Sequence, residues 1–172
     1  MKQYFKLITV LGFLYMAFTF ATCKYSTKDT APIPTEVNTF RVNYFENKAR
    51  YVNPQVAPRL TEALKQKIIS QTRLRQTNDE GDYDISGYLS DYSVTTSGVA
   101  NQTAGTNRLN VTFHLIFKNT TDPDPKKSFE ADITTNYDFS AQKSLQDAEA
   151  ELADKIIKNV TDGIFNRIFS NW

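Results

Sequence analysis

The residue whose type and position point most clearly to chemistry is Cys23, the only cysteine in 172 residues. It follows two lysines and an apolar run over residues 7–20, an order typical of a secretory signal peptide. The run is too short for a good membrane-spanning helix. A lone exported thiol has no disulfide partner, whereas thioether attachment of diacylglycerol would use it. We therefore expect cleavage after Thr22 and lipidation of Cys23. An ordinary signal peptide with an incidental cysteine is the alternative.

Residue sets for catalysis or metal binding are missing from the sequence. His114 is the only histidine, and it stands among outward polar residues in a strand pattern, so we interpret it as a surface residue. Glu130, Asp132 and Asp138 share one face of another strand pattern, where solvated charge explains them better than an acid–base pair. The sequence has no His/Cys cluster and no glycine-rich phosphate loop. We expect no enzymatic activity, no metal and no cofactor.

The chain divides into three expected parts: a signal peptide at 1–22, the lipidated Cys23 with a flexible tether at 23–36, and one folded domain at 37–172. Two prolines among small polar residues predict the extended tether. Removal of the signal leaves 150 of the 172 residues, the usual size of one domain. It also leaves 18 Lys and Arg against 19 Asp and Glu, and this near-neutral balance argues against nucleic acid as a partner.

Apolar spacing predicts the elements of the domain. Residues recurring every four positions predict two helices, one from Asn53-Pro54 to about Gln71 and one from Ser144 to about Phe169. Ser144 and Asp147 resemble a capping box at the start of the second helix. Alternating apolar and polar residues predict four strands, at 37–45, 82–95, 109–118 and 129–139. A short extended piece at 73–77 and a loop at 96–106 complete the order β-α-β-β-β-α.

Each predicted strand has one apolar and one polar face. This pattern favours an α+β, two-layer sandwich in which two helices pack on one face of a mixed four-stranded sheet. The other face should meet water or a polar surface. Its expected residues are Arg41, Asn43, Ser86, Tyr88, Thr112, His114, Glu130, Asp132 and Asp138.

Several segments in this order resemble the LptE family, in the branch found in Bacteroidota. They are the lipidated Cys23, Tyr44–Asn47, Val52–Pro54, Thr61–Lys65, Asp84–Tyr88, Asn107–Leu109 and the terminal Phe-Ser-Asn-Trp. The likeness covers nearly the whole mature chain. The lipid-attachment site departs from the usual pattern, because Phe20 and Thr22 replace the preferred aliphatic and small residues.

The resemblance implies an outer-membrane lipoprotein that plugs and helps assemble the LptD barrel at one copy each, the pair inserting lipopolysaccharide into the outer leaflet. A plug in a polar lumen needs polar outer surfaces over its own core. We expect a lipid-anchored protein on the periplasmic side and in the barrel lumen, with residues 46–53, 96–106 and 140–143 at the tip farthest from the anchor. A periplasmic lipoprotein of similar fold that serves another envelope machine or binds a small ligand is the alternative.

Two residues carry further hypotheses. Thr30 lies in Asp29-Thr30-Ala31, which resembles the tripeptide used for O-glycosylation in Bacteroidota. Arg108 lies where the 96–106 loop enters a strand near the expected tip, so it is a candidate contact for an anionic lipid phosphate or a partner carboxylate. A solvated arginine is the alternative for Arg108.

Overall fold

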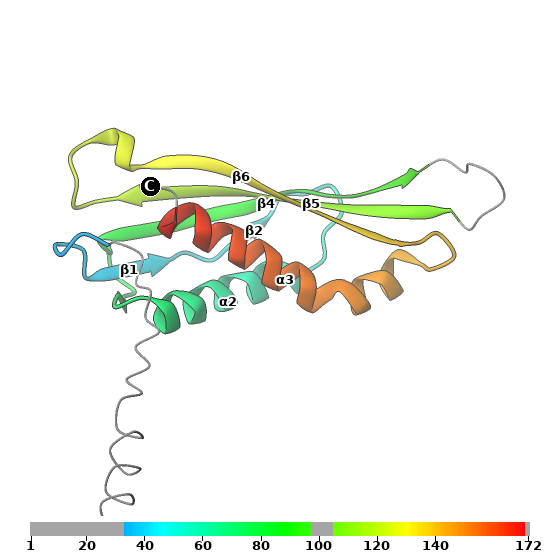
Figure 1. Ribbon diagram of the computed structural model, residues 1–172, viewed down its shortest axis with the longest axis horizontal. Coiled ribbons are helices and arrows are strands. Elements are labelled where there is room, and N and C mark those ends of the chain that lie inside the picture. The colour runs from blue at the N-terminus through cyan, green and yellow to red at the C-terminus, as the bar shows by residue number, and fades with distance from the viewer. Residues whose placement is uncertain (1–32, 98–104, 171–172) are drawn as a thin grey trace, which may run out of the picture.

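The computed structural model describes residues 33–97 and 105–170, which form one sheet with two long helices on one of its faces (Figure 1). The α+β class predicted from the sequence is confirmed. In chain order the elements are β1 (Thr39–Val42), β2 (Glu46–Asn47), α2 (Val56–Gln71), β3 (Arg75–Gln76), β4 (Tyr83–Ser97), β5 (Thr106–Asn119), the 3-10 turn η1 (Pro125–Lys127), β6 (Phe129–Ser140) and α3 (Leu145–Phe169).

The sheet is mixed, as predicted, but it has six strands rather than four. The strand order is β3-β1-β4-β5-β6, with β2 also paired to β4. β1 runs parallel to β3 and β4, and β2 runs parallel to β4, whereas β5 is antiparallel to both β4 and β6. The additional strands, β2 and β3, contain two residues each. A two-residue strand has no period-two pattern, so alternation in the sequence cannot reveal it.

The alternation in β4 changes phase at Ser90. Leu89 pairs with Phe113 and Asp91 pairs with Thr112, so Ser90 is an extra residue, a β-bulge. Before the bulge the odd-numbered residues face the helices; after it Tyr92 does, and its side chain is buried. The bulge therefore keeps both halves of β4 apolar on the same face.

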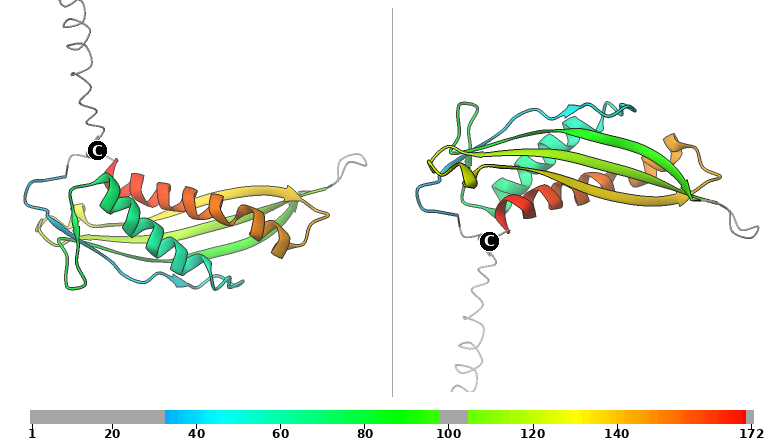
Figure 2. Two further views of the ribbon diagram at one scale, coloured as in Figure 1. Left: turned by 90° about the horizontal axis from the view of Figure 1, so that it is seen from below. Right: turned by 90° about the horizontal axis from the view of Figure 1, so that it is seen from above.

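The core lies between the sheet and the helices. From α2 the core receives the fully buried side chains of Leu60, Leu64 and Ile68. From α3 it receives the buried side chains of Ile156, Val160 and Ile164. Phe113, in the middle of β5, is fully buried and meets the Phe45 ring edge-on at 4.6 Å. Figure 2 shows the consequence: the helices cover one face of the sheet and leave the other open.

The helix starts agree with the predicted caps in part. The Ser144 hydroxyl accepts a hydrogen bond from the Asp147 backbone N–H at 3.1 Å and donates to the Asp147 carboxylate at 2.6 Å. The side chain of Asp147 thus binds the cap hydroxyl, whereas a full capping box would bind the cap N–H. The first helix begins at Val56, two residues after the predicted Pro54.

The two ends of the long sheet differ. The prediction that segment 46–53 lies at the far tip is wrong. Gly105 and Ala141 are hydrogen-bonded through their backbones, so the turn at 140–143 lies beside the start of β5; we call this the hairpin end. Segment 46–53 does not reach it. Asn47 pairs with Leu89, eight residues before Ser97, which corresponds to about 25 Å of strand. The reason is that β2 pairs with the middle of β4.

At the other end, called here the tether end, the chain joins the domain earlier than expected. Ile33 and Val37 are buried, and the Arg73 guanidinium donates hydrogen bonds to the carbonyls of Ile33 and Pro34 at 3.3 and 2.5 Å. Residues 33–36 of the expected tether are therefore fastened to the fold. Over residues 33–97 and 105–170, no helix combines the length and the apolar character needed to span a membrane.

Candidate interaction surface

The open face of the sheet is a broad polar surface that the fold assembles from several strands. β-strand alternation sends every second side chain of β4, β5 and β6 to this face, and the strand register brings them into rows. Thr112 and Thr134 form one row, with hydroxyl oxygens 3.1 Å apart. We define the open face by its row-forming residues: Arg41, Asn43, Asp84, Tyr88, Arg108, Thr112, His114, Glu130, Asp132, Thr134 and Asp138.

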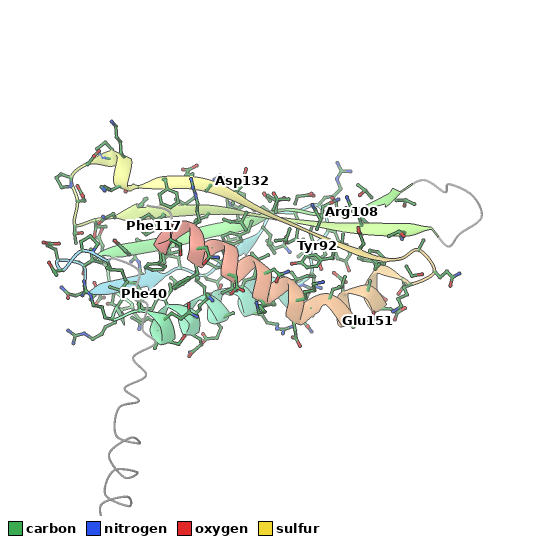
Figure 3. The ribbon with its side chains drawn as sticks, viewed as in Figure 1. Phe40, Tyr92, Arg108, Phe117, Asp132 and Glu151 are labelled. Atoms are coloured by element: carbon green, nitrogen blue, oxygen red, sulfur yellow. The ribbon has the colours of Figure 1, made fainter. Side chains whose placement is uncertain are left out.

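Arg108 is held by a carboxylate of this same chain. Its Nε donates to Asp138 Oδ1 at 2.7 Å and its Nη2 donates to Asp138 Oδ2 at 3.2 Å, a two-pronged pair across β5 and β6. This contact raises the pKa of Arg108 and lowers the pKa of Asp138. Arg108 lies toward the hairpin end, as predicted, and Phe117 toward the opposite end of β5 (Figure 3). The charge of Arg108 is already balanced by Asp138. Contact between Arg108 and an anion of another molecule remains a prediction.

His114 stands between two carboxylates of β6. Its Nδ1 is 2.7 Å from Asp132 Oδ1, and its Nε2 is 3.2 Å from Glu130 Oε2. Hydrogen bonding to Asp132 is the main reason that the pKa of His114 is raised, and Glu130 adds to it. The Tyr88 ring lies beside the imidazole, with 5.0 Å between centroids. His114 of β5 forms a local charge network on the open face with Asp132 and Glu130 of β6.

A second polar cluster ties β1 to β4. The Arg41 Nε donates to Asp84 Oδ2 at 3.0 Å, and the Asn43 amide donates to Asp84 Oδ1 at 2.5 Å. Asp84 is buried, so both of its oxygens meet donors instead of water. Nearby, the Lys48 ammonium lies 4.3 Å from the centroid of the Tyr88 ring. The open face is therefore polar but largely satisfied by its own residues.

Positive charge and aromatic surface meet at the tether end. A cleft of about 650 Å³ is lined by three cations and one carboxylate, Lys126, Lys127, Arg167 and Asp122, together with Phe117 and Phe129. The Arg167 guanidinium carbon is 5.1 Å from the centroid of the Phe129 ring. Within the described part of the chain, none of the three cations forms an ion pair. Sequence reasoning missed this cleft, because Arg167 lies 40 residues from Lys127 and only the fold joins them.

Sequence reasoning also missed a buried carboxylate, Glu149 of α3, which is 8% exposed. Glu149 lines a smaller cleft of about 280 Å³ between the start of α2 and α3. Tyr51 and Asn53, from the segment before α2, hydrogen-bond to its two oxygens at 3.1 and 3.0 Å. The available signal was Glu149 itself: it follows the small Ala148 on the buried side of the predicted helix, where a charge is unusual.

The other predicted site residues have separate outcomes. Cys23 and Thr30 lie outside the described residues, so lipidation and glycosylation remain predictions. The carboxylates of β6 are not gathered into one site, because Glu130 and Asp132 face His114 while Asp138 faces Arg108. In the described ranges, no group of three or more His, Cys, Asp or Glu side chains is arranged to hold a metal ion.

Several solved structures are similar to this chain at low sequence identity, and two of those described here have TM-scores above 0.5. A minor lipoprotein from Acinetobacter baumannii aligns over 78% of this chain and 93% of its own, with a TM-score of 0.51 and 13% identity. A neuraminyllactose-binding hemagglutinin homolog from Helicobacter pylori aligns over 84% and 89%, with a TM-score of 0.51 and 10% identity. Lipoprotein B from Nitrosomonas europaea aligns over 78% and 84%, with a TM-score of 0.48 and 14% identity.

Sequence comparison gives a more specific result than the fold. No curated protein matches the chain significantly. The family model LptE, described as lipopolysaccharide-assembly, matches residues 37–168. This span runs from before β1 almost to the end of α3, and so it includes the whole sheet, α2 and all of α3 except its last residue. The chain therefore belongs to the LptE family of lipopolysaccharide-assembly proteins.

Proposed function

We propose that this protein is an outer-membrane lipoprotein that plugs an LptD-like β-barrel, helps it to assemble, and acts with it to insert lipopolysaccharide into the outer leaflet. The proposal assigns one copy of the protein to one barrel. It assigns no reaction to the protein, because the role requires shape, charge and position rather than bond chemistry. Membership of the LptE family supports the role in lipopolysaccharide assembly.

The observation that carries the proposal is the open face of the sheet. It is broad and polar, and its charges pair within the chain: Arg108 with Asp138, and His114 with Asp132. Such a face can lie against the polar wall of a barrel lumen without burying an unpaired charge, which is the costly event in a polar interface. The helices supply a separate core on the opposite face, so the plug keeps its fold independently of the barrel.

The way in which residues 33–36 join the domain supports this proposal. Residues 33–36 join the domain at the tether end, so lipid on Cys23 would hold that end toward the inner leaflet. The hairpin end would then point along the barrel axis, away from the anchor. The cationic cleft at the tether end, with Lys126, Lys127 and Arg167, would offer phosphate contacts beside aromatic side chains.

Depletion of the protein in its host tests the proposal. We expect an LptD-like barrel that is misassembled, and cells that become permeable to large apolar antibiotics. Re-expression of wild-type protein should restore both properties. Normal barrel assembly with a leaky membrane would leave only a general envelope role, and normal behaviour in both assays would refute the proposal.

The alternative of a small-ligand binder has two clefts in its favour: the cationic cleft of about 650 Å³ at the tether end, to which we assign phosphate contacts, and the smaller cleft at Glu149. The volume of the Glu149 cleft, about 280 Å³, is at the lower limit of ligand sites, which usually measure about 300–1,000 Å³ and bury most of the ligand. A cleft of this size is better matched to one side chain of a partner. We therefore keep lipopolysaccharide assembly as the proposed function.

A further inference from the structure

The cleft at Glu149 contains an acidic side chain that is buried without a cationic partner. Tyr51 Oη donates to one carboxylate oxygen at 3.1 Å and Asn53 Nδ2 donates to the other at 3.0 Å. Both donors are neutral. Of the residues that line the cleft, Arg59 alone is basic, and its guanidinium is 2.6 Å from Asp154 Oδ1 instead. The negative charge of Glu149 thus has hydrogen bonds but no counter-charge.

A second polar group of the same cleft lies at the Glu149 carboxylate. The Tyr92 side chain lines the cleft and is 2% exposed. Apart from the contact with Glu149, its buried hydroxyl has no hydrogen-bond partner in the described part of the chain. Burial and the nearby Glu149 carboxylate both raise the pKa of Tyr92, so the hydroxyl stays protonated. Buried hydroxyls are nearly always hydrogen-bonded in folded proteins, which agrees with a contact between the Tyr92 hydroxyl and Glu149.

The remaining walls of the cleft suit a cation. The rings of Tyr51 and Tyr92 stack with 5.8 Å between centroids, and aromatic faces attract guanidinium and ammonium groups. A carboxylate has about four lone-pair positions, and Tyr51, Asn53 and Tyr92 supply three donors to Glu149. A guanidinium carries five N–H donors in one plane. It could bind the remaining carboxylate position and lie against the tyrosine rings.

We propose that the Glu149 cleft receives the basic side chain, arginine or lysine, of a protein partner. The charge complementarity and the size of the cleft define the occupant. The partner's identity as the barrel rests on the function proposed above. The cleft lies beside Asn53, and segment 46–53 flanks β4 at Leu89. This location is midway along the sheet, where a plug would be surrounded by its barrel.

The first experiment uses purified, full-length mature protein and two probes, N-acetyl-arginine methylamide and its neutral isostere N-acetyl-citrulline methylamide. NMR titration follows the ring signals of Tyr51 and Tyr92. We expect saturable shifts with the arginine probe and at least tenfold weaker binding of the citrulline probe. Glu149→Gln should weaken arginine binding at least tenfold. The matched control is Glu151→Gln, on the same helix, whose carboxylate is exposed and paired with Lys143; it should bind as wild type.

Equal binding of both probes, or no saturable shift with the arginine probe, would overturn the cationic pocket. The comparison of probes on wild-type protein needs no variant, so it stands even if Glu149→Gln folds poorly. The second experiment measures barrel recovery after co-purification with each variant at equal amounts of folded protein. We expect Glu149→Gln to recover at least threefold less barrel than Glu151→Gln.

The two experiments separate the possible failures. Arginine binding together with unchanged barrel recovery would mean that the pocket takes a free cation, and it would overturn the assignment to a partner side chain. A wild-type protein that recovers no barrel would contradict the proposed function. The probe titration would still decide whether the pocket binds cations.

Discussion

At the scale of single residues, His114 shows how a lone histidine can be both a surface residue and part of a network. Its two ring nitrogens face Asp132 and Glu130, and these carboxylates stabilise the protonated imidazole. The sequence pattern correctly predicted an outward position in a strand. It could not give the partners, because the register between β5 and β6 decides which carboxylate lies opposite.

The His114 network predicts a measurable shift. We expect NMR titration to give a pKa of His114 above its ordinary value of 6.5. Because the folded-state value is raised, the associated stability is fully present below pH 6.5 and is lost as the pH rises through the folded-state pKa. Asp132→Asn should lower the pKa of His114. Asp138→Asn, on the same strand face but bound to Arg108, is the control and should leave it near the wild-type value.

Arg108 and Asp138 allow a test of whether Arg108 has a role outside the chain. Arg108→Glu places two carboxylates together and should disturb the hairpin end. The swap Arg108→Glu with Asp138→Arg restores the internal pair. If Arg108 also contacts a lipid phosphate or a partner carboxylate, the swapped protein should fold normally yet fail to restore the outer-membrane barrier. A swapped protein that restores the barrier fully would show that the pair is only internal.

At the scale of elements, strand β5 is the centre of the sheet and of the core. Leu109, Val111, Phe113, Leu115 and Phe117 are all buried, as their strict alternation predicts. The bulge at Ser90 of β4 was not predictable in the same way. The strand at 82–95 was predicted, but the bulge within it produces no signal except a change of phase in the alternation. The short strands β2 and β3 were not predicted from the sequence either, because a strand of two residues has no alternation of apolar and polar positions.

The position of Phe113 gives the element-scale prediction. Its ring is fully buried against Phe45, and Gly87 of β4 lies beneath it, where even a methyl group would approach the ring to 2.6 Å. We expect Phe113→Ala to reduce the free energy of unfolding by about 3–5 kcal/mol. Urea denaturation would measure this change. The control Lys118→Ala, exposed on the same strand, should stay within about 0.5 kcal/mol. Similar values for both variants would contradict the assigned core.

At the scale of the whole molecule, the fold separates two tasks between the faces of one sheet. The helices cover one face and supply stability, while the open face presents paired polar side chains (Figure 2). The polar and apolar faces of the sheet were predictable from the alternation of polar and apolar residues in the strands. The Glu149 cleft and the cationic cleft were not, because each joins residues far apart in the chain, such as Asn53 with Glu149. Only three-dimensional packing brings them together.

The proposed lipid anchor on Cys23 would set the orientation of this two-sided molecule, and it gives a prediction of its own. We expect Cys23→Ala protein to leave the membrane fraction, because it would lack the thioether lipid. Intact-mass measurement of wild-type protein from its own host should show a chain that starts at Cys23 and carries acyl mass. The same spectrum tests Thr30, since a glycan would add further mass. Membrane-bound Cys23→Ala protein, with no acyl mass on the wild type, would refute lipidation.

The central claim is that the protein works inside a barrel, and co-purification from detergent-solubilised membranes of its host tests it most directly. A tag on the C-terminal side would avoid the Cys23 end, and quantitative mass spectrometry would give the ratio of the recovered chains. We expect an LptD-like barrel at one copy for each copy of this protein. Recovery of the protein as a free monomer, from cells whose LptD-like barrel is fully assembled without it, would contradict the assignment.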